Sequence, residues 1–379
     1  MESNNRTASA KNSKIDSIQV LRGIAAVIVA VYHLKYLATD IPAFSQTLDF
    51  FFNSGAAGVN LFFVISGFIM VYITSHKTFG PKDVFQFLIK RFVRIWPTYV
   101  LITLLYAFLT YRYQIGYQAS QIIRSILFIP LTNDNPPFYG YATLSVGWSL
   151  NYEIYFYFLV GISLLFTKYR WVVFFLLVII TLVVIPQLAG HFTTDPTRHF
   201  NFGNHYINMI TNPIIWNFVY GVVIGLLFIT PLSNRYLSRI FSSLTLVSTV
   251  TIIVVWQYLS GFFGGQGPLQ WGVGSGLLFL AVLFYSSSKV IQFPQWLVRL
   301  GDISFSIYLL HLPVKLLIET IFQRVGYPLY GAGSAMFFLT MSMTIICSVI
   351  SHKYLELEFS NYVKNLLLPD QRKSPSRTS

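Results

Sequence analysis

Ten long apolar runs, separated by short polar segments, set the pattern of this chain. A membrane-spanning helix needs about 20 predominantly apolar residues. The sequence predicts such helices near 18–37, 57–75, 93–111, 147–166, 171–188, 209–229, 240–259, 271–288, 303–323 and 333–355. Residues 119–130 are too few to span and end at Pro130, so we expect an interfacial or re-entrant helix there.

The amino-acid composition also indicates a membrane protein. Of the 379 residues, 54% are hydrophobic and 10% are charged, and the mean hydropathy is +0.60. Soluble domains carry about 25% charged residues, so this chain has too little polar surface for a water-soluble particle of its size. The sequence therefore predicts an all-α, polytopic integral membrane protein. Its single cysteine, Cys347, excludes an internal disulfide and a cysteine-rich metal site.

The placement of basic residues predicts the topology. A formal net charge of +13 would suggest nucleic acid in a soluble protein, but in a membrane protein lysine and arginine gather in cytoplasmic loops, and we expect no nucleic-acid partner. With the N-terminus inside, the cytoplasmic side receives Lys77, Lys82, Lys90, Arg91, Arg94, Lys168, Arg170, Arg235, Arg239, Lys289, Arg299, Lys353, Lys364, Arg372, Lys373 and Arg377. The outer side and its helix ends hold Lys35, Arg112, Arg124, Arg198, Lys315 and Arg324.

Both termini are therefore predicted in the cytoplasm. We expect a cytoplasmic segment at 1–17, a membrane domain at 18–358 and a basic cytoplasmic tail at 359–379. Two predicted outer loops, 131–146 and 189–208, are rich in Asn, Pro, Gly, His and aromatic residues. Such loops can cover a polar cavity and stack on sugar rings, or they can form an ordinary aromatic belt at the membrane edge.

The first apolar run carries two ionisable residues. Arg22 and His33 are eleven positions apart, which is three helical turns plus about 20°, so both lie on one face. The rise along the helix separates them by ~16 Å. Ionisable groups inside a membrane are costly and usually functional. This pair therefore marks a candidate site.

A basic cluster opens the third run, in the sequence KRFVRIWP. Arg91 and Arg94 are three apart and share a helix face. Two guanidinium groups there can clamp phosphate groups. The alternative is that inner-edge arginines, like the neighbouring Lys90, serve only the topology.

A carboxylate enters the membrane in the fourth run. Glu153 lies about two turns into the helix that starts in VGWSLNYEIYFY. Because an unpaired carboxylate at that depth is costly, we expect it to face a cavity and to pair with His33, which lies at a similar depth. A carboxylate bonded to an imidazole raises its basicity, as a general base requires. A purely structural Glu–His or Glu–Tyr bond is the alternative.

The ninth run carries a polar stripe. Tyr308, His311, Lys315 and Glu319 follow one another at three- or four-residue spacing, so they lie along one helix face. Lys315 and Glu319 can form an internal ion pair, whereas His311 lies near mid-depth. No P-loop, HExxH or Gly-x-Ser-x-Gly motif occurs in the sequence, and we expect no bound metal.

Together these motifs resemble those of the membrane-bound acyltransferase-3 family. The similarity runs through Arg22 to His33, GAAGVNLFFVISGF (55–68), RFVRIWP (91–97), VGWSLNYE (146–153) and FSIYLLHLP (305–313), in the family's order. Within the family, the sequence is most similar to exopolysaccharide O-acetyltransferases of the succinoglycan type. Many relatives carry Asp where this chain has Asn60, so we assign Asn60 no catalytic role.

The resemblance implies transfer of an acyl group, usually acetyl, from cytoplasmic acyl-CoA to a hydroxyl of a surface or exported glycan. It assigns essential roles to Arg22 and His33 and a donor-binding role to Arg91 and Arg94. Because Arg22 also lies at the inner edge, we predict that it binds the donor phosphates together with Arg91 and Arg94. Acetyl-CoA would then be a co-substrate, with no permanently bound cofactor, and the enzyme would lie in the inner (plasma) membrane.

We accordingly predict that His33, oriented by Glu153, deprotonates the acceptor, although an acyl-histidine intermediate would serve equally. We predict that the substrates are lined by Trp148, Ser149, Tyr308, His311 and Lys315.

Two competing functions use the same residues. Buried ionisable groups and ten spans also suit a proton-coupled exporter of a small polar solute. A non-catalytic subunit of a polysaccharide export complex is the third hypothesis. The sequence does not indicate the oligomeric state.

Overall fold

The computed structural model describes residues 2–368 except 76, 112–115, 191, 199, 201 and 327–332, with side chains from residue 16 onward. This part of the chain is helical and contains no strand, as predicted. Its α-helices are α1 (Glu2–Leu34), α2 (Pro42–Phe52), α3 (Gly58–Thr74), α4 (Pro81–Tyr111), α5 (Ala119–Ile126), α6 (Trp148–Leu164), α7 (Arg170–Ile179), α8 (Ile185–Leu188), α9 (His205–Ile210), α10 (Trp216–Ile229), α11 (Pro231–Ile240), α12 (Leu244–Ser260), α13 (Val273–Ser288), α14 (Gln295–Asp302), α15 (Ser304–Arg324), α16 (Gly333–Ser351) and α17 (Ser360–Leu367). Wider helical turns join α7 to α8 (Ile180–Val184), lead into α13 (Pro268–Gly272) and join α16 to α17 (His352–Phe359).

Helical segments occupy all ten predicted ranges. Within the described residues, seven are long and apolar enough to cross a membrane: Asp16–Leu37, Pro42–Thr74, Pro81–Tyr111, Thr167–Leu188, Pro268–Ser288, Ser304–Arg324 and Gly333–Leu367. An eighth candidate, Pro213–Ile229 with Pro231–Ile240, bends by 100° between its two parts. The other two predicted spans correspond to α6 and α12, each 17 residues long. The protein is therefore a multi-pass membrane protein, and the short helix expected at 119–130 is α5.

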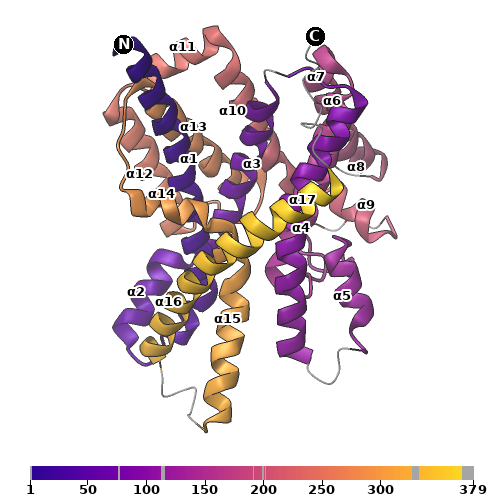
Figure 1. The fold of residues 1–379 in the computed structure, drawn as a ribbon, viewed down its shortest axis with the longest axis vertical. Helices are drawn as coiled ribbons and strands as arrows, with labels where there is room; N and C mark the ends of the chain where they lie inside the picture. The colour runs from indigo at the N-terminus through magenta and orange to yellow at the C-terminus, as the bar shows by residue number, and fades with distance from the viewer. Residues whose placement is uncertain are drawn as a thin grey trace, which may run out of the picture.

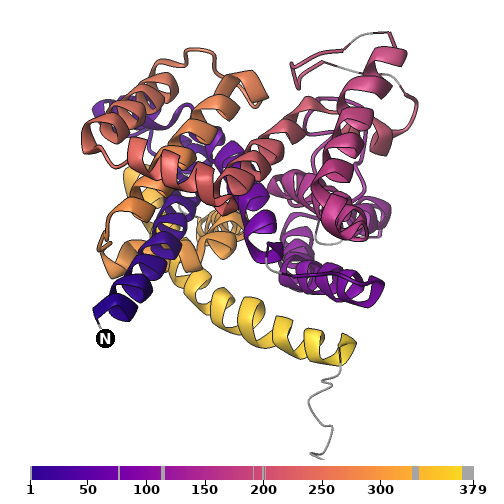
Figure 2. The ribbon, with the colours of Figure 1, turned by 90° about the horizontal axis from the view of Figure 1, so that it is seen from above.

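Helix α3 lies at the centre of the bundle and packs chiefly against α10 (Figure 2). Gly67 of α3 and Gly221 of α10 lie in this contact. A Cβ at Gly67 would overlap the carbonyl oxygen of Phe218, and one at Gly221 would overlap that of Val64. Close backbone approach through small residues is the usual way in which helices associate inside membranes.

The glycine-rich segment at 260–276 joins α12 to α13 and includes the start of α13. Gly261 ends α12 with φ of +68°, a conformation that glycine adopts without steric cost. The turn also bonds to the central helices, because the carbonyl of Gln266 accepts from Asn60 Nδ2 at 2.8 Å and from Asn217 Nδ2 at 3.3 Å. Asn60 thus has a structural partner in the helix-linking turn.

Two of the predicted outer loops bond to each other. Asn133 Oδ1 accepts from His205 Nδ1 at 2.8 Å and from Asn208 Nδ2 at 2.7 Å. The Tyr139 hydroxyl donates to the Asn208 carbonyl at 2.8 Å. Segments 131–146 and 189–208 therefore form one joined structure, while their suggested contact with sugar stays a prediction.

The arrangement of the helix ends agrees with the predicted topology. The start of α1 and helix α11 lie at one end of the molecule, and α2, α5 and the C-terminal end of α15 lie at the other (Figure 1). The sequence assigns the first group to the cytoplasm and the second to the outside. Which end faces the cytoplasm, and the three-part domain division, stay predictions.

Replacing Gly67 by Ala should destabilise the protein, because the added methyl group overlaps the backbone of α10. Overpacking of this kind costs about 1–3 kcal/mol. Unfolding by SDS in mixed micelles would measure the loss. Gly116→Ala is the matched control, since a Cβ there meets no atom within 4 Å. Equal stability of the two variants would contradict the close α3–α10 contact.

Candidate functional site

A cavity lies between α1, α3, α4, α6 and α15. It encloses about 730 Å³ of space not filled by atoms, including solvent at its open side. Its wall is mostly apolar, with phenylalanine and isoleucine side chains. Its polar lining residues are Arg22, Ser66, Arg94, Ser149, Glu153, Tyr157 and Tyr308. Five helices therefore bring together five of the predicted site residues: Arg22, Arg94, Ser149, Glu153 and Tyr308.

Glu153 has two hydroxyl partners in this cavity. Its carboxylate accepts a 3.3 Å hydrogen bond from Ser66 Oγ of α3 and a short one from the Tyr157 hydroxyl, one turn further along α6. It also interacts electrostatically with Arg22 and Arg91. Glu153 therefore provides negative charge next to the guanidinium groups.

The predicted pairing of Glu153 with His33 is wrong. His33 bonds through Nδ1 to the carbonyl of Val29, and its ring contacts are with Tyr32 and His311. The prediction used depth alone, whereas the direction in which each helix turns its side chain decides the partner. The alternative interpretation, a structural Glu–Tyr bond, is confirmed, because Glu153 accepts from the Tyr157 hydroxyl.

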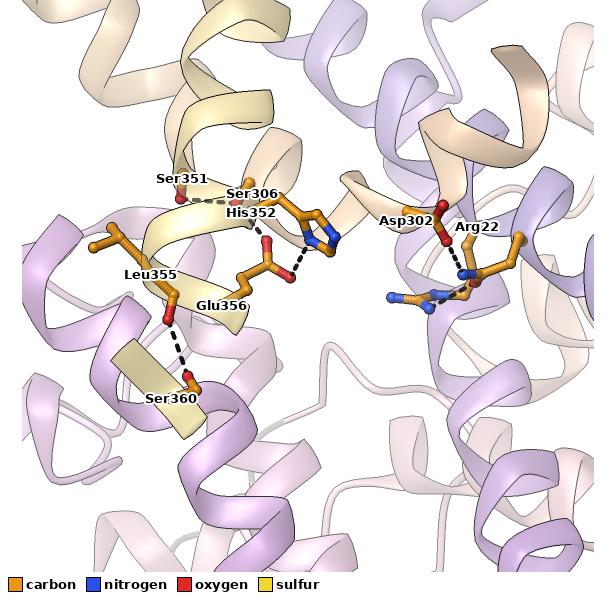
Figure 3. Close-up of polar contacts among 9 residues, drawn as sticks. Arg22, Asp302, Ser306, Ser351, His352, Leu355, Glu356 and Ser360 are labelled. Atoms are coloured by element: carbon orange, nitrogen blue, oxygen red, sulfur yellow. Dashed lines mark hydrogen bonds and ion pairs between the residues drawn. The ribbon is translucent and has the colours of Figure 1, made fainter. Parts of the chain in front are cut away.

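Arg22 lies between two polar groups near the start of the membrane part of α1. Its Nη1 donates to Gln19 Oε1 at 2.9 Å, and Gln19 Nε2 donates in turn to Asp302 at the end of α14 (Figure 3). Its charge also interacts with Glu356, which lies on the turn between α16 and α17. The guanidinium is thereby held in place while it still reaches the cavity wall.

The group around Glu356 is itself a bonded cluster. Ser306 of α15 donates to the Glu356 carboxylate and shares a 2.8 Å hydrogen bond with Ser351 (Figure 3). His352 Nδ1 lies 3.2 Å from the second carboxylate oxygen. This cluster fixes α15 to α16 beside the arginine.

The two arginines of α4 take different positions. Arg94 lines the cavity, whereas Arg91, one turn earlier, is half-buried and faces a separate pocket. Arg91 Nε is buried and has no hydrogen-bond partner among the described residues. Arg91 and Arg94 thus share a helix face as predicted, but Arg94 faces the cavity and Arg91 faces the separate pocket.

His33 and His311 form a pair. Their ring centroids are 5.1 Å apart, and His311 is fully buried. His33 Nδ1 lies 2.9 Å from the Val29 carbonyl, and His311 Nδ1 lies 3.2 Å from the Ile307 carbonyl. A carbonyl oxygen only accepts hydrogen bonds, so each Nδ1 carries a proton, and in the neutral form of each ring the lone pair lies on Nε2. His311 Nε2 has no partner within the described part of the chain.

Tyr308 lies between the cavity and this pair. Its hydroxyl shares a 2.7 Å hydrogen bond with Ser149 and lies 2.7 Å from the Val146 carbonyl, while its ring centroid is 6.4 Å from that of His311. Ser149 and Tyr308 line the cavity as predicted. The polar stripe of α15 therefore leads from the cavity to the histidines.

The other predicted lining residues lie elsewhere. Lys315 forms the expected ion pair with Glu319 at 3.6 Å and stacks over Tyr36 at 4.4 Å. Trp148 is buried in aromatic packing against Phe138, with ring centroids 4.8 Å apart, and does not line the cavity.

The sequence reasoning missed Ser66 and Tyr157, which both bond to Glu153. Tyr157 is four residues after Glu153, a spacing that places both on one face and that would have predicted the contact. Ser66 precedes Gly67 in an apolar run, where small residues usually serve helix packing, so the sequence gives no signal for its bond to Glu153.

Comparison with known proteins identifies the kind of enzyme. Residues 15–352 match the acyltransferase-3 family, whose model describes an acyltransferase domain. The chain belongs to this family. It is therefore an acyltransferase of the membrane, and membership favours this function over an exporter or a non-catalytic subunit.

Individual relatives of this acyltransferase come from two bacteria. It is 29% identical over 302 residues to the exopolysaccharide production protein ExoZ of Rhizobium meliloti (strain 1021), covering 78% of this chain and 86% of ExoZ. It is 22% identical over 388 residues to the O-acetyltransferase OatA of Staphylococcus aureus (strain MRSA252), covering 94% of this chain and 59% of OatA. The acyltransferase thus spans little more than half the length of OatA. No solved structure gives a significant match.

Replacing Glu153 by Ala should destabilise the acyltransferase, because the buried Tyr157 hydroxyl loses its acceptor. An unsatisfied buried polar group costs about 1–3 kcal/mol. Glu153→Gln keeps an acceptor oxygen and should retain most of the stability. Thermal unfolding in detergent would compare the two, and equal losses in both variants would show that the charge, not the hydrogen bond, stabilises this region.

Proposed function

We propose that this protein is an O-acyltransferase of the inner membrane that moves an acetyl group from cytoplasmic acyl-CoA to a hydroxyl of a surface or exported polysaccharide. Membership of the acyltransferase-3 family supports the reaction class. The names of two relatives, an exopolysaccharide production protein and an O-acetyltransferase, support the polysaccharide acceptor and the acetyl group.

The cavity suits the acyl-carrying arm of the donor. Its apolar wall accommodates an acyl-pantetheine chain, and Arg22 and Arg94 provide positive charge on its lining. Arg22 and His33 are ~16 Å apart along α1, which is within the reach of that arm. The donor would bind from the cytoplasm, with its thioester directed towards Tyr308 and the histidine pair.

The tautomer of the paired histidines carries the proposal. The helix carbonyls accept from Nδ1–H of both rings, so the neutral form of each ring has its lone pair on Nε2, the atom that can act as a general base. His33 Nε2 takes the proton of the acceptor hydroxyl as the hydroxyl oxygen bonds to the thioester carbonyl carbon. The carbon–sulfur bond then breaks, and the thiolate takes the proton back from the imidazolium. The products are an acetyl ester and free CoA.

Glu153 has a different role from the one first predicted. Bonded to Ser66 and Tyr157 and close to the arginines, it balances charge in the donor cavity. Its negative charge offsets part of the positive charge of the guanidinium groups that the donor would meet. His311 adds a second imidazole beside His33, with ring centroids 5.1 Å apart, and this position makes it a positioning residue for the base.

Replacing His33 by Ala should lower kcat by about 10²–10⁴, the usual contribution of a general base. The assay uses purified protein in proteoliposomes with radiolabelled acetyl-CoA and an oligosaccharide acceptor, and it follows label on the glycan. His205→Ala is the matched control, since His205 bonds to Asn133 in the outer segments. Unchanged transfer by the His33 variant would overturn the assignment.

A further inference from the structure

The histidine pair is followed by a second layer on the same two helices. Tyr36 is three residues after His33, in the tight turn that continues α1. Lys315 is four residues after His311 on α15. Both lie about one turn further along, and they contact each other, because Lys315 Nζ is 4.4 Å from the centre of the Tyr36 ring. This outer layer is adjacent to His33 on the side that the topology prediction places outside.

Both lysines of this region already have a carboxylate partner. Lys315 Nζ lies 3.6 Å from Glu319 Oε1, one turn further along α15, and both side chains are partly exposed. Lys35 Nζ lies 2.6 Å from Asp49 Oδ1 of α2 and also donates to Asn53 Oδ1 at 3.1 Å. The two positive charges next to the outer layer are therefore offset by two negative charges.

Aromatic rings border His33 on this side. The Tyr32 ring contacts the His33 ring edge to face, with centroids 5.0 Å apart. Tyr32 also interacts with Tyr141 of the outer segment that precedes α6, and the Tyr141 ring stacks on Phe138 with centroids 4.6 Å apart. Tyr36 is 49% exposed and Tyr141 is 39% exposed, so both have ring surface free for a ligand. A molecule that reaches His33 from outside would therefore meet tyrosine rings.

Exposed tyrosine rings beside paired charges suit an uncharged sugar. The C–H groups on the face of a sugar ring pack against an aromatic ring, while tyrosine hydroxyl groups and carboxylates bind the sugar hydroxyl groups. A sugar that carries a carboxylate is disfavoured here, because Glu319 already occupies the ammonium group of Lys315 and repels a second negative charge. Such a repulsive group is a common source of specificity in binding sites.

We propose that the acceptor glycan binds at this outer layer, in a subsite that selects an uncharged sugar residue over a uronic acid. The inference rests on the proposed function. The subsite consists of Tyr36, Tyr141, Lys315 and Glu319. The two tyrosine rings hold the sugar, and Glu319 accepts from its hydroxyl groups. The hydroxyl to be acetylated then points to His33 Nε2, and Lys315 keeps Glu319 in place through the ion pair.

The first test uses the full chain in nanodiscs, with labelled acetyl-CoA and a panel of neutral gluco- and galacto-oligosaccharides. Tyr36→Ala should raise KM for the acceptor by about tenfold, because the ring contact is lost, and leave KM for acetyl-CoA unchanged. Tyr36→Phe keeps the ring and should retain the native acceptor KM. The matched control is Tyr117→Ala, at an exposed tyrosine just before α5. An acceptor KM that Tyr36→Ala leaves unchanged would overturn the proposal.

The second test compares each neutral oligosaccharide with its counterpart oxidised to a uronic acid at C6. The native protein should have the larger kcat/KM for the neutral member. Glu319→Gln should raise the relative kcat/KM of the uronic acid about fivefold or more, because Lys315 can then pair with the acceptor carboxylate. Asp134→Asn, which removes an exposed carboxylate of the outer segment, should not change this ratio. Equal shifts in both variants, or a native preference for uronic acids, would contradict the proposed selectivity.

A binding measurement separates this inference from the proposed function. Saturation-transfer NMR with the same oligosaccharides and nanodiscs, without acetyl-CoA, reports sugar contacts independently of turnover. Sugar binding that Tyr36→Ala weakens, together with no acetyl transfer, would contradict the proposed function and leave the subsite in place. Acetyl transfer by the native protein with no effect of Tyr36→Ala on binding or KM would overturn the subsite alone. Absence of both binding and transfer for every oligosaccharide would overturn both.

Discussion

Positive charge buried in an apolar bundle requires negative charge close by, and here Glu153 supplies it. A charged side chain inside the membrane is costly unless it faces a polar cavity or a partner. Glu153 of α6 accepts from Ser66 of α3 and interacts with Arg22 of α1 and Arg91 of α4. Four helices therefore meet around one carboxylate. The cavity lies where these groups meet, and the Ser306–Glu356–His352 cluster provides further negative charge near Arg22.

Features that depend on spacing within one helix could be predicted from the sequence. The apolar runs predicted the helices, and four-residue spacing predicted the Lys315–Glu319 ion pair. Contacts between helices could not be predicted in the same way. The pairing of His33 with Glu153 was inferred from depth, but depth does not specify the direction of a side chain around its helix axis. His33 instead contacts His311, from a helix more than 270 positions later in the chain. Trp148 was likewise expected to line the substrates, yet it turns into the aromatic core.

The histidine pair combines both kinds of information. Each ring binds the carbonyl four residues earlier in its own helix, so its tautomer follows from local geometry. The proton on Nδ1 of each histidine is thus a property of its own helix. Their approach to 5.1 Å is a property of how α1 packs against α15. The hydrogen bond of each ring therefore depends on its own helix, whereas the distance between the two rings depends on the packing of α1 against α15.

The α3–α10 contact also has a consequence for how such an enzyme can diversify. Gly67 fixes one face of α3 against α10, whereas Phe62, Ser66 and Ile69 on another face line the cavity. Substitutions on the cavity face change the volume open to an acyl chain without changing the helix contact that holds the bundle together. A lineage can therefore alter the size of the transferred group one side chain at a time, while the glycine-bearing face keeps the architecture constant.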